Sequence, residues 1–190
     1  MPENRFKALF QRALRAQKEE DLEEALRIWR GILVMQPDYV PALNNMGIAL
    51  RRLGRIAESE AVLRTGLERA PHAPELWISL GQTLAHWGVA EEAVTALRKA
   101  IVLDDRNPNA HFALGQVLDD QGDFMAAMAA YQTACDVDPA HAPSMMALAD
   151  GWRERGQIGQ AEKLYRQASE QPGAPPEAGY KLAMTLLSQG

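Results

Sequence analysis

The side chains best suited to catalysis or metal binding are four histidines and one cysteine. His72, His86, His111 and His141 are scattered along the chain, and none has a second ligand at the spacing used by zinc sites. Cys135 follows Ala134 in an apolar segment, which is typical of a small buried residue rather than a nucleophile. The sequence therefore predicts neither a metal site nor a cofactor.

Phosphate binding and acid–base catalysis have equally little support in the sequence. The glycines occur singly and at regular intervals, so they do not build a glycine-rich phosphate loop. The acidic pairs Glu23–Glu24 and Glu91–Glu92 fall on helical segments, where a solvated charged surface is the simpler interpretation. We therefore predict that the chain is not an enzyme.

The composition narrows the class of partner and the compartment. The 190 residues are 47% hydrophobic and 24% charged, with a net charge of −5. Nucleic acid is not expected as a partner, because phosphate binding needs clustered basic residues. No apolar run reaches the length of a membrane span, and the first residues show no signal-peptide pattern, so membrane insertion is not expected either. A single cysteine and an excess of arginine over lysine favour a cytoplasmic, bacterial protein.

An internal repeat organises the sequence. Glycine recurs every 34 residues, at Gly54, Gly88, Gly122, Gly156 and Gly190. Four more columns keep this period: Ala13, Gly47, Gly81, Gly115, Ala149 and Ala183; Ala25, Ser59, Ala93, Ala127 and Ala161; Trp29, Leu63, Leu97, Tyr131 and Tyr165; and Ile32, Gly66, Ala100, Ala134 and Ala168. Small and large residues in constant register predict closely packed helices, and we expect Trp87 and Trp152 to pack between them as well.

Each period has room for two helices of about fourteen residues and a turn. The glycine column suits the turn, where a left-handed backbone conformation ends the first helix. Pro74 and Pro108 suit the first turn of a helix, and Asn107 is a candidate N-cap. The predicted repeats are about 6–39, 40–73, 74–107, 108–141 and 142–175, followed by a terminal helix at 176–190.

These columns resemble the tetratricopeptide repeat family, whose period is 34 residues. The best match is Trp77-Ile-Ser-Leu-Gly81 with Leu84, Gly88, Ala93, Leu97 and Ala100, and the resemblance runs from about Phe6 to Gly190. It implies an all-α fold, a right-handed α-solenoid of about five helix-turn-helix repeats and a C-terminal single helix, in one domain over 1–190. It also implies that the first helix of each pair lines a concave groove.

A ligand should meet the surface of the first helices that lies opposite the packing columns. This surface comprises Asn44, Asn45, Ile48, Arg51 and Arg52; Ile78, Ser79, Gln82, Ala85 and His86; Asn109, Phe112, Gln116, Asp119 and Asp120; and Met146, Asp150 and Arg153. The amides can pair with a peptide backbone, and Ile78, Phe112 and Met146 offer apolar contacts. The mixture predicts a protein or peptide ligand.

One binding mode of the family is not matched. Some tetratricopeptide proteins hold a C-terminal carboxylate with Lys, Asn and Arg on successive first helices. Asn45 occupies one matching position, but Phe10, Leu14, Glu75 and Ser79 occupy the others. The resemblance therefore does not extend to that activity.

Charge is spread unevenly along the repeats. The second has five basic and three acidic residues, whereas the fourth has five aspartates and no Lys or Arg. One interpretation is a groove with a basic part near Arg51, Arg52 and Arg55 and an acidic part near Asp119 and Asp120. The other is an ordinary solvated surface.

The C-terminal helix leaves several interpretations open. Leu182, Ala183 and Leu186 match packing columns, while Met184 and Leu187 make other faces apolar. The helix is a natural cap, the last part of a fragment, or a surface for self-association. The leading hypothesis for function is an adaptor or scaffold that binds a protein segment. The alternatives are an N-terminal module of a larger bacterial enzyme, such as a glycosyltransferase or sulfotransferase, and a self-assembling scaffold.

Overall fold

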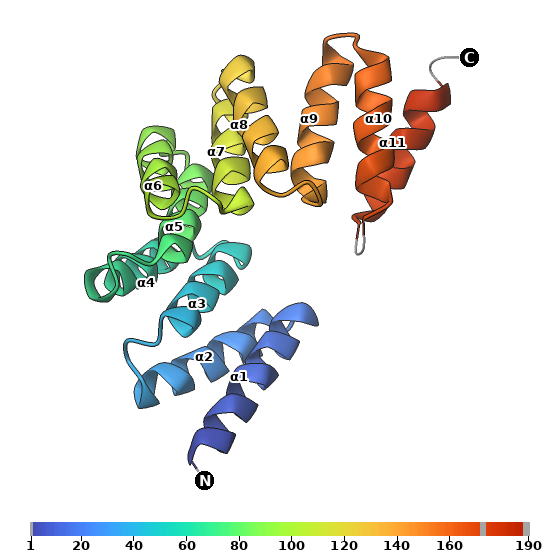
Figure 1. The fold of residues 1–190 in the computed structure, drawn as a ribbon. Helices are drawn as coiled ribbons and strands as arrows, with labels where there is room; N and C mark the ends of the chain where they lie inside the picture. Colours follow the sequence, from blue (N-terminus) through green and yellow to red (C-terminus); the bar gives the residue numbers. More distant parts are fainter. Residues whose placement is uncertain (1, 172–173, 188–190) are drawn as a thin grey trace. The chain divides into compact units, whose positions relative to one another are not determined.

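The chain is all-α, as predicted, over the residues that the structure describes, 2–171 and 174–187 of a computed structural model. Eleven helices lie within those ranges (Figure 1). They are α1 (Pro2–Lys18), α2 (Leu22–Met35), α3 (Val40–Arg52), α4 (Ile56–Arg69), α5 (Pro74–Trp87), α6 (Ala90–Leu103), α7 (Pro108–Asp120), α8 (Phe124–Val137), α9 (Ala142–Glu154), α10 (Ile158–Ser169) and α11 (Pro176–Leu187). The helices form sequential pairs with a C-terminal helix, as predicted. None of these helices is long and apolar enough to span a membrane.

The signals that end and begin the helices act as the sequence predicts. Gly54, Gly88, Gly122 and Gly156 all have positive φ, between 73° and 86°, and close the turn inside each pair. Pro74 and Pro108 begin α5 and α7. The Asn107 Oδ1 atom caps α7 by accepting from the Asn109 N–H at 3.1 Å. The predicted glycine at 190, and the Pro172–Gly173 step, lie outside the described residues.

The first pair of helices departs from this turn chemistry. Glu20 stands where the later pairs have glycine, and its φ is 64°. The left-handed conformation costs a residue with a Cβ roughly 1–2 kcal/mol. Arg52, at the end of α3, pairs with the Glu20 carboxylate. The strained turn is therefore tied to the next pair by an ion pair.

The chain divides into two compact units, Met1–Leu103 (unit 1) and Asp104–Gly190 (unit 2). In unit 1 each helix from α1 to α6 packs on the next, and α3 also packs on α5. In unit 2 each helix from α7 to α11 packs on the next. Each unit thus has its own helix pairs and its own core.

Close contact between paired helices explains the glycine columns. A Cβ atom on Gly81 would lie 2.5 Å from Cγ of Leu97, and one on Gly115 would lie 2.5 Å from Cε1 of Tyr131. Both large side chains are buried. Glycine weakens a helix by roughly 0.5–1 kcal/mol relative to alanine. That cost is offset here because the second helix packs directly on the backbone of the first.

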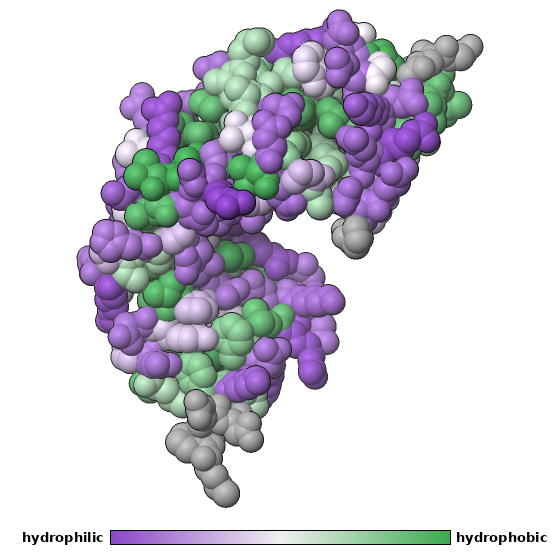
Figure 2. Space-filling view, viewed as in Figure 1, coloured by the Kyte–Doolittle hydropathy of each residue, from purple (hydrophilic) through white to green (hydrophobic). Residues whose placement is uncertain are grey.

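Three of the expected packing positions are exposed: Trp87, Ala183 and Leu186. Trp87, expected to pack between helices, is 49% exposed, because it is the last residue of α5 and the neighbouring helices no longer cover it. Ala183 occupies the column of Gly47 and Gly81 but is exposed. No following helix covers it within the described residues. Figure 2 shows hydrophobic surface over this C-terminal helix.

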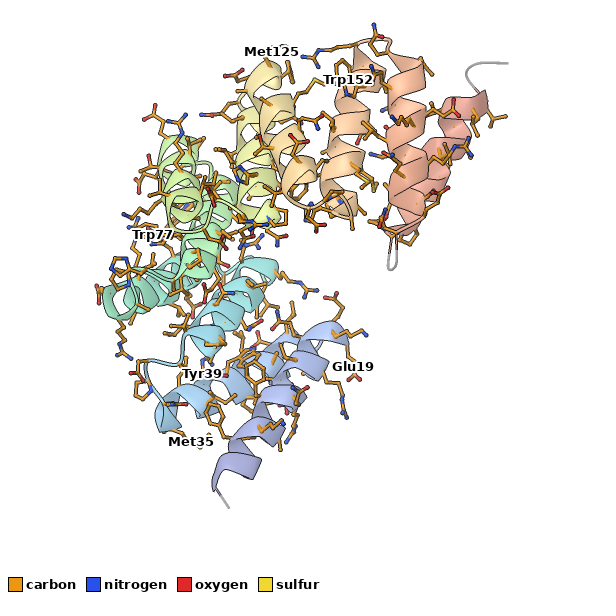
Figure 3. All side chains as sticks on the ribbon, viewed as in Figure 1. Glu19, Met35, Tyr39, Trp77, Met125 and Trp152 are labelled. Atoms are coloured by element: carbon orange, nitrogen blue, oxygen red, sulfur yellow. The ribbon has the colours of Figure 1, made fainter. Side chains whose placement is uncertain are left out.

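An aromatic cluster joins the first pair of helices to α3. The Tyr39 ring meets the rings of Phe6 and Phe10 edge to face, with centroids 5.0 and 5.9 Å apart, and its side chain can be followed in Figure 3. Phe10 also meets Trp29 at 5.4 Å. Edge-to-face pairs of this kind add roughly 0.5–1.5 kcal/mol beyond the area that they bury. They fix α1, which begins unit 1.

Candidate functional site

In unit 1 the half-buried residues predicted to face a ligand on α3 and α5 define what we call the α3–α5 surface (Asn44, Ile48, Arg51 and Gln82), whereas the predicted Ser79 is buried. Two hydrogen bonds cross between the helices. The Ser79 hydroxyl donates to Asn44 Oδ1 at 2.6 Å, and Arg51 Nη2 donates to Gln82 Oε1 at 3.0 Å. Each bond uses an amide oxygen, so the NH2 groups of both amides remain available as donors.

A buried polar chain beneath this surface holds α3 to α5. The Ser59 hydroxyl donates to the Gly47 carbonyl at 2.8 Å and lies 3.0 Å from the Thr83 hydroxyl. The Thr83 hydroxyl can donate its one proton either to Ser59 Oγ, which links the helices, or to the Ser79 carbonyl of its own helix, 2.8 Å away. Ser59 and Thr83 are fully buried. Buried hydroxyl groups with partners fix the arrangement of the helices that carry them, so the α3–α5 surface rests on a rigid base.

Other residues predicted for this surface have less side chain free to contact a ligand. Asn45 donates from its side chain to the Pro41 carbonyl of its own helix at 2.7 Å. Ile78 is only 8% exposed, because its helix α5 packs against α3, α4 and α6, and it offers little surface to a ligand. His86 is exposed, and Ala85 is half-buried beside it.

The two arginines at the end of α3 have different environments. Arg52 pairs with Glu20 and donates to the Gln17 carbonyl at 3.3 Å. Arg51 is half-buried, forms no ion pair with a described carboxylate, and has an Nε atom that is buried without a hydrogen-bond partner. Burial, and then the charge of Arg52, lower the pKa of Arg51 below its usual value. Arg51 is thus the partly desolvated cation of this surface that has no counter-ion.

In unit 2 two of the equivalent positions are acidic, with Asp119 in place of Arg51 and Asp150 in place of Gln82, and Asp150 hydrogen-bonds to residues of two other helices. Its carboxylate accepts from the Tyr165 hydroxyl at 2.5 Å and from Lys181 Nζ at 2.5 Å, and Arg153 lies 3.7 Å away. Burial, and then the bond to Asp150, raise the pKa of Tyr165 well above its usual value. Asp150 and Arg153 therefore contact each other, and the network joins α9, α10 and α11.

Asp119 and Asp120, at the end of α7, are exposed and have no basic partner in the described part of unit 2. Burial raises the pKa of Asp119, and the charges of Glu154, Asp120 and Asp150 raise it further. A hydrogen bond from the Tyr131 hydroxyl partly offsets these effects. This end of α7 repels anions.

The apolar residues predicted for unit 2 lie mostly inside it. The Phe112 ring packs against Tyr131 and against His141, with centroids 5.8 and 5.6 Å away, so it is half-buried. Met146 is also half-buried, whereas Gln116 is exposed. Neither Gln116 nor Met146 has a hydrogen bond that ties it to the acidic network.

His141 has a role that the sequence did not reveal. It is the N-cap of α9, where Nδ1 accepts from the Ser144 N–H at 3.3 Å and Nε2 lies 3.3 Å from Asn109 Oδ1. Nδ1 must be unprotonated to accept, which leaves the proton on Nε2, facing the acceptor. Burial lowers the pKa of His141. A Ser three residues after the histidine was the available signal, but histidine is an unusual cap.

Comparison with known proteins identifies the family. Models of the tetratricopeptide repeat match residues 10–74 and 112–175, and a further model of the TPR repeat matches 88–122. The chain belongs to the tetratricopeptide repeat family, as the sequence columns predicted.

Individual relatives are more distant. Human tetratricopeptide repeat protein 7A is 34% identical over 83 residues, which are 44% of this chain and 10% of that protein. The chain therefore spans about a tenth of that relative. The solved structure of TTC0263, a thermophilic TPR protein of Thermus thermophilus, is 19% identical with a TM-score of 0.85, over 96% of this chain and 99% of that one. YrrB, described as a TPR protein with an unusual peptide-binding site, is 18% identical with a TM-score of 0.59, over 93% and 88% of the two chains.

Proposed function

We propose that this protein is a scaffold that binds a peptide or protein segment on its first helices, and that the α3–α5 surface is the principal contact in unit 1. The observation that carries the proposal is the pair of unengaged NH2 donors at Asn44 and Gln82, whose amide oxygens accept from Ser79 and Arg51. Side-chain amides fixed in one orientation pair well with backbone carbonyls, which every peptide offers.

The family and the one cysteine of the chain agree with a binding role. The described residues hold no group of three or more His, Cys, Asp or Glu side chains placed to share a metal ion. Burial and the charges of Asp136 and Asp138 raise the pKa of the Cys135 thiol to about 11, so it is protonated at neutral pH and is a poor nucleophile. Membership of a family typical of interaction scaffolds agrees with this assignment.

Affinity capture from source cells tests the proposed function. Wild-type protein is compared with Asn44→Ala/Gln82→Ala and with a matched double variant, Arg98→Ala/Lys99→Ala, on the exposed side of α6. We expect bound proteins to be lost with the first variant and kept with the second. Loss only with the α6 variant would place binding on the second helices and contradict the proposal.

A second function is favoured by one specific observation on α11. Tyr180, Met184 and Leu187 are 67%, 49% and 75% exposed, and with exposed Ala183 they form one stripe with helical spacing. An antiparallel copy of α11 would place Tyr180 against Leu187 and Met184 against Ala183 of the other copy, a large residue on a small one. In the body of unit 1, Leu97 lies on Gly81 in the same way. We propose self-association of two copies through this stripe.

Sedimentation velocity over a range of concentrations tests this second function. We expect a dimer that dissociates on dilution, because one helix pair is a small interface. Met184→Glu should give a monomer at every concentration, and Gln167→Glu, on the exposed side of α10, should not. Wild-type protein that remains monomeric at the highest concentration would contradict self-association.

A further inference from the structure

We propose that the segment bound on the α3–α5 surface carries an aspartate or glutamate side chain whose carboxylate binds Arg51. This inference rests on the proposed function and specifies the chemistry of the ligand. It begins from the one half-buried guanidinium of the described unit-1 residues that has no carboxylate partner, although its neighbour Arg52 has one.

The hydrogen bonds of Arg51 leave donors unused. A guanidinium has five N–H donors, and the protein provides an acceptor for one of them, through Gln82 Oε1. The Nε atom is buried without a partner. No hydrogen bond of Nη1 is present among the described residues, and this atom is not fully buried, so we infer that it is the donor a ligand meets. A planar carboxylate matches the Nη edge of a guanidinium and forms two hydrogen bonds with it.

The surroundings of Arg51 favour an anion over a neutral acceptor. Part of the guanidinium has already lost its water in the free protein, so a bound carboxylate is screened less than at an open surface. The Arg52 charge adjoins it, while the Glu20 carboxylate is already held by Arg52. The Gln82 Nε2 group can donate to the same anion, because only its oxygen is engaged.

The positions of the amides favour an acidic side chain within an extended segment. Asn44 and Arg51 are seven residues apart on α3, which is about 10 Å along the helix axis. Three residues of an extended peptide span the same length, at about 3.3 Å each. A backbone carbonyl bound by Asn44 would therefore lie about three residues from the side chain bound by Arg51. The ligand pattern is an acidic residue in a segment that continues on both sides.

Side-chain NMR of the full chain tests this inference with three small probes. The signals are the Nε–Hε group of Arg51 and the NH2 groups of Asn44 and Gln82. The probes are N-acetylglutamate methylamide, its neutral isostere N-acetylglutamine methylamide, and N-acetylalanine, whose only charge is a C-terminal carboxylate. At constant ionic strength we expect saturable shifts with the glutamate probe and at least tenfold weaker binding of the other two.

Variants assign the shifts to the site. Arg51→Gln should abolish them, and Arg98→Gln, on α6, should leave them unchanged. Equal binding of the neutral probe, equal binding of N-acetylalanine, no saturable shift at Arg51, or shifts that persist at Gln82 in Arg51→Gln would each overturn the inference. The proposed function fails separately, when Asn44→Ala/Gln82→Ala still captures its cellular partners.

Discussion

Units 1 and 2 place opposite charges at equivalent positions of their first helices. Arg51 of α3 and Asp119 of α7 are 68 residues apart, which is two periods of the repeat. The large side chain that packs on the glycine of the first helix also differs. It is Leu63 on Gly47 in unit 1 and Tyr131 on Gly115 in unit 2. A tyrosine hydroxyl at this position needs an acceptor and finds Asp119. A leucine has no hydroxyl and needs no acceptor. The residue type in the core is therefore linked to the charge of the residue at the end of the first helix.

The largest expected effect comes from filling the glycine column, and it should differ between the units. Gly81→Ala should lower the free energy of unfolding by about 1–2 kcal/mol, because Leu97 and the Ala93 carbonyl lie 2.5 and 3.2 Å from the new Cβ. Gly115→Ala should cost less, since the three atoms nearest its new Cβ all belong to the Tyr131 side chain, whereas Gly81 also faces the backbone carbonyl of Ala93. Urea denaturation followed by circular dichroism measures both, and equal losses would refute this difference in packing.

Removal of the tyrosine hydroxyls should have the next largest effect. Tyr165→Phe removes a bond to a charged acceptor from a fully buried side chain and should cost about 1–2 kcal/mol. Tyr131→Phe should cost less, because its partner Asp119 is exposed to water. Urea denaturation is again the measurement. A larger loss of unfolding free energy for Tyr131→Phe would show that the hydrogen bond to Asp119 is stronger than the one to Asp150.

The strained turn of unit 1 has a smaller expected effect. Glu20 has a positive φ where unit 2 has glycine at Gly122 and Gly156. Glu20→Gly and Glu20→Ala both lose the ion pair with Arg52. The difference between their free energies of unfolding therefore measures the cost of the positive φ alone. We expect the glycine variant to have the higher free energy of unfolding, by about 1 kcal/mol. Equal stabilities of the two variants would mean that this turn is not strained.

The smallest expected effect concerns the acidic end of α7. The pKa of Asp119 is raised in the folded protein, so the folded state favours its protonated form. Stability from this group is present below its unfolded pKa and is lost as the pH rises through the folded value. Asp119→Asn should therefore raise the melting temperature slightly at neutral pH. Asp105→Asn, an exposed control, should not. A lower melting temperature for Asp119→Asn would show that the charge is stabilising.

The sequence predicts the fold more completely than the site, for physical reasons. The fold requires positive φ at Gly54 and its equivalents and close packing at Gly81. Such positions tolerate only a few residue types, so the same types recur in the repeat and reveal the fold. The hydrogen-bond and ion-pair partners of Arg51 and Arg52 cannot be predicted from the residues that recur in the repeat. They depend on whether a side chain about 32 residues away, such as Glu20 or Gln82, supplies an acceptor. The predicted burial of Trp87 is wrong because helix spacing does not show where neighbouring helices end.

Site-specific photocrosslinking tests the central claim, that ligands bind on the first helices, most directly. A photoreactive phenylalanine derivative is placed at Ile48 on α3 and, in a second protein, at Arg98 on α6, and both are irradiated in source cells. Discrete crosslinked proteins are expected from position 48, reduced by Arg51→Gln, and none from position 98. Crosslinks from position 98 with none from position 48 would contradict that claim.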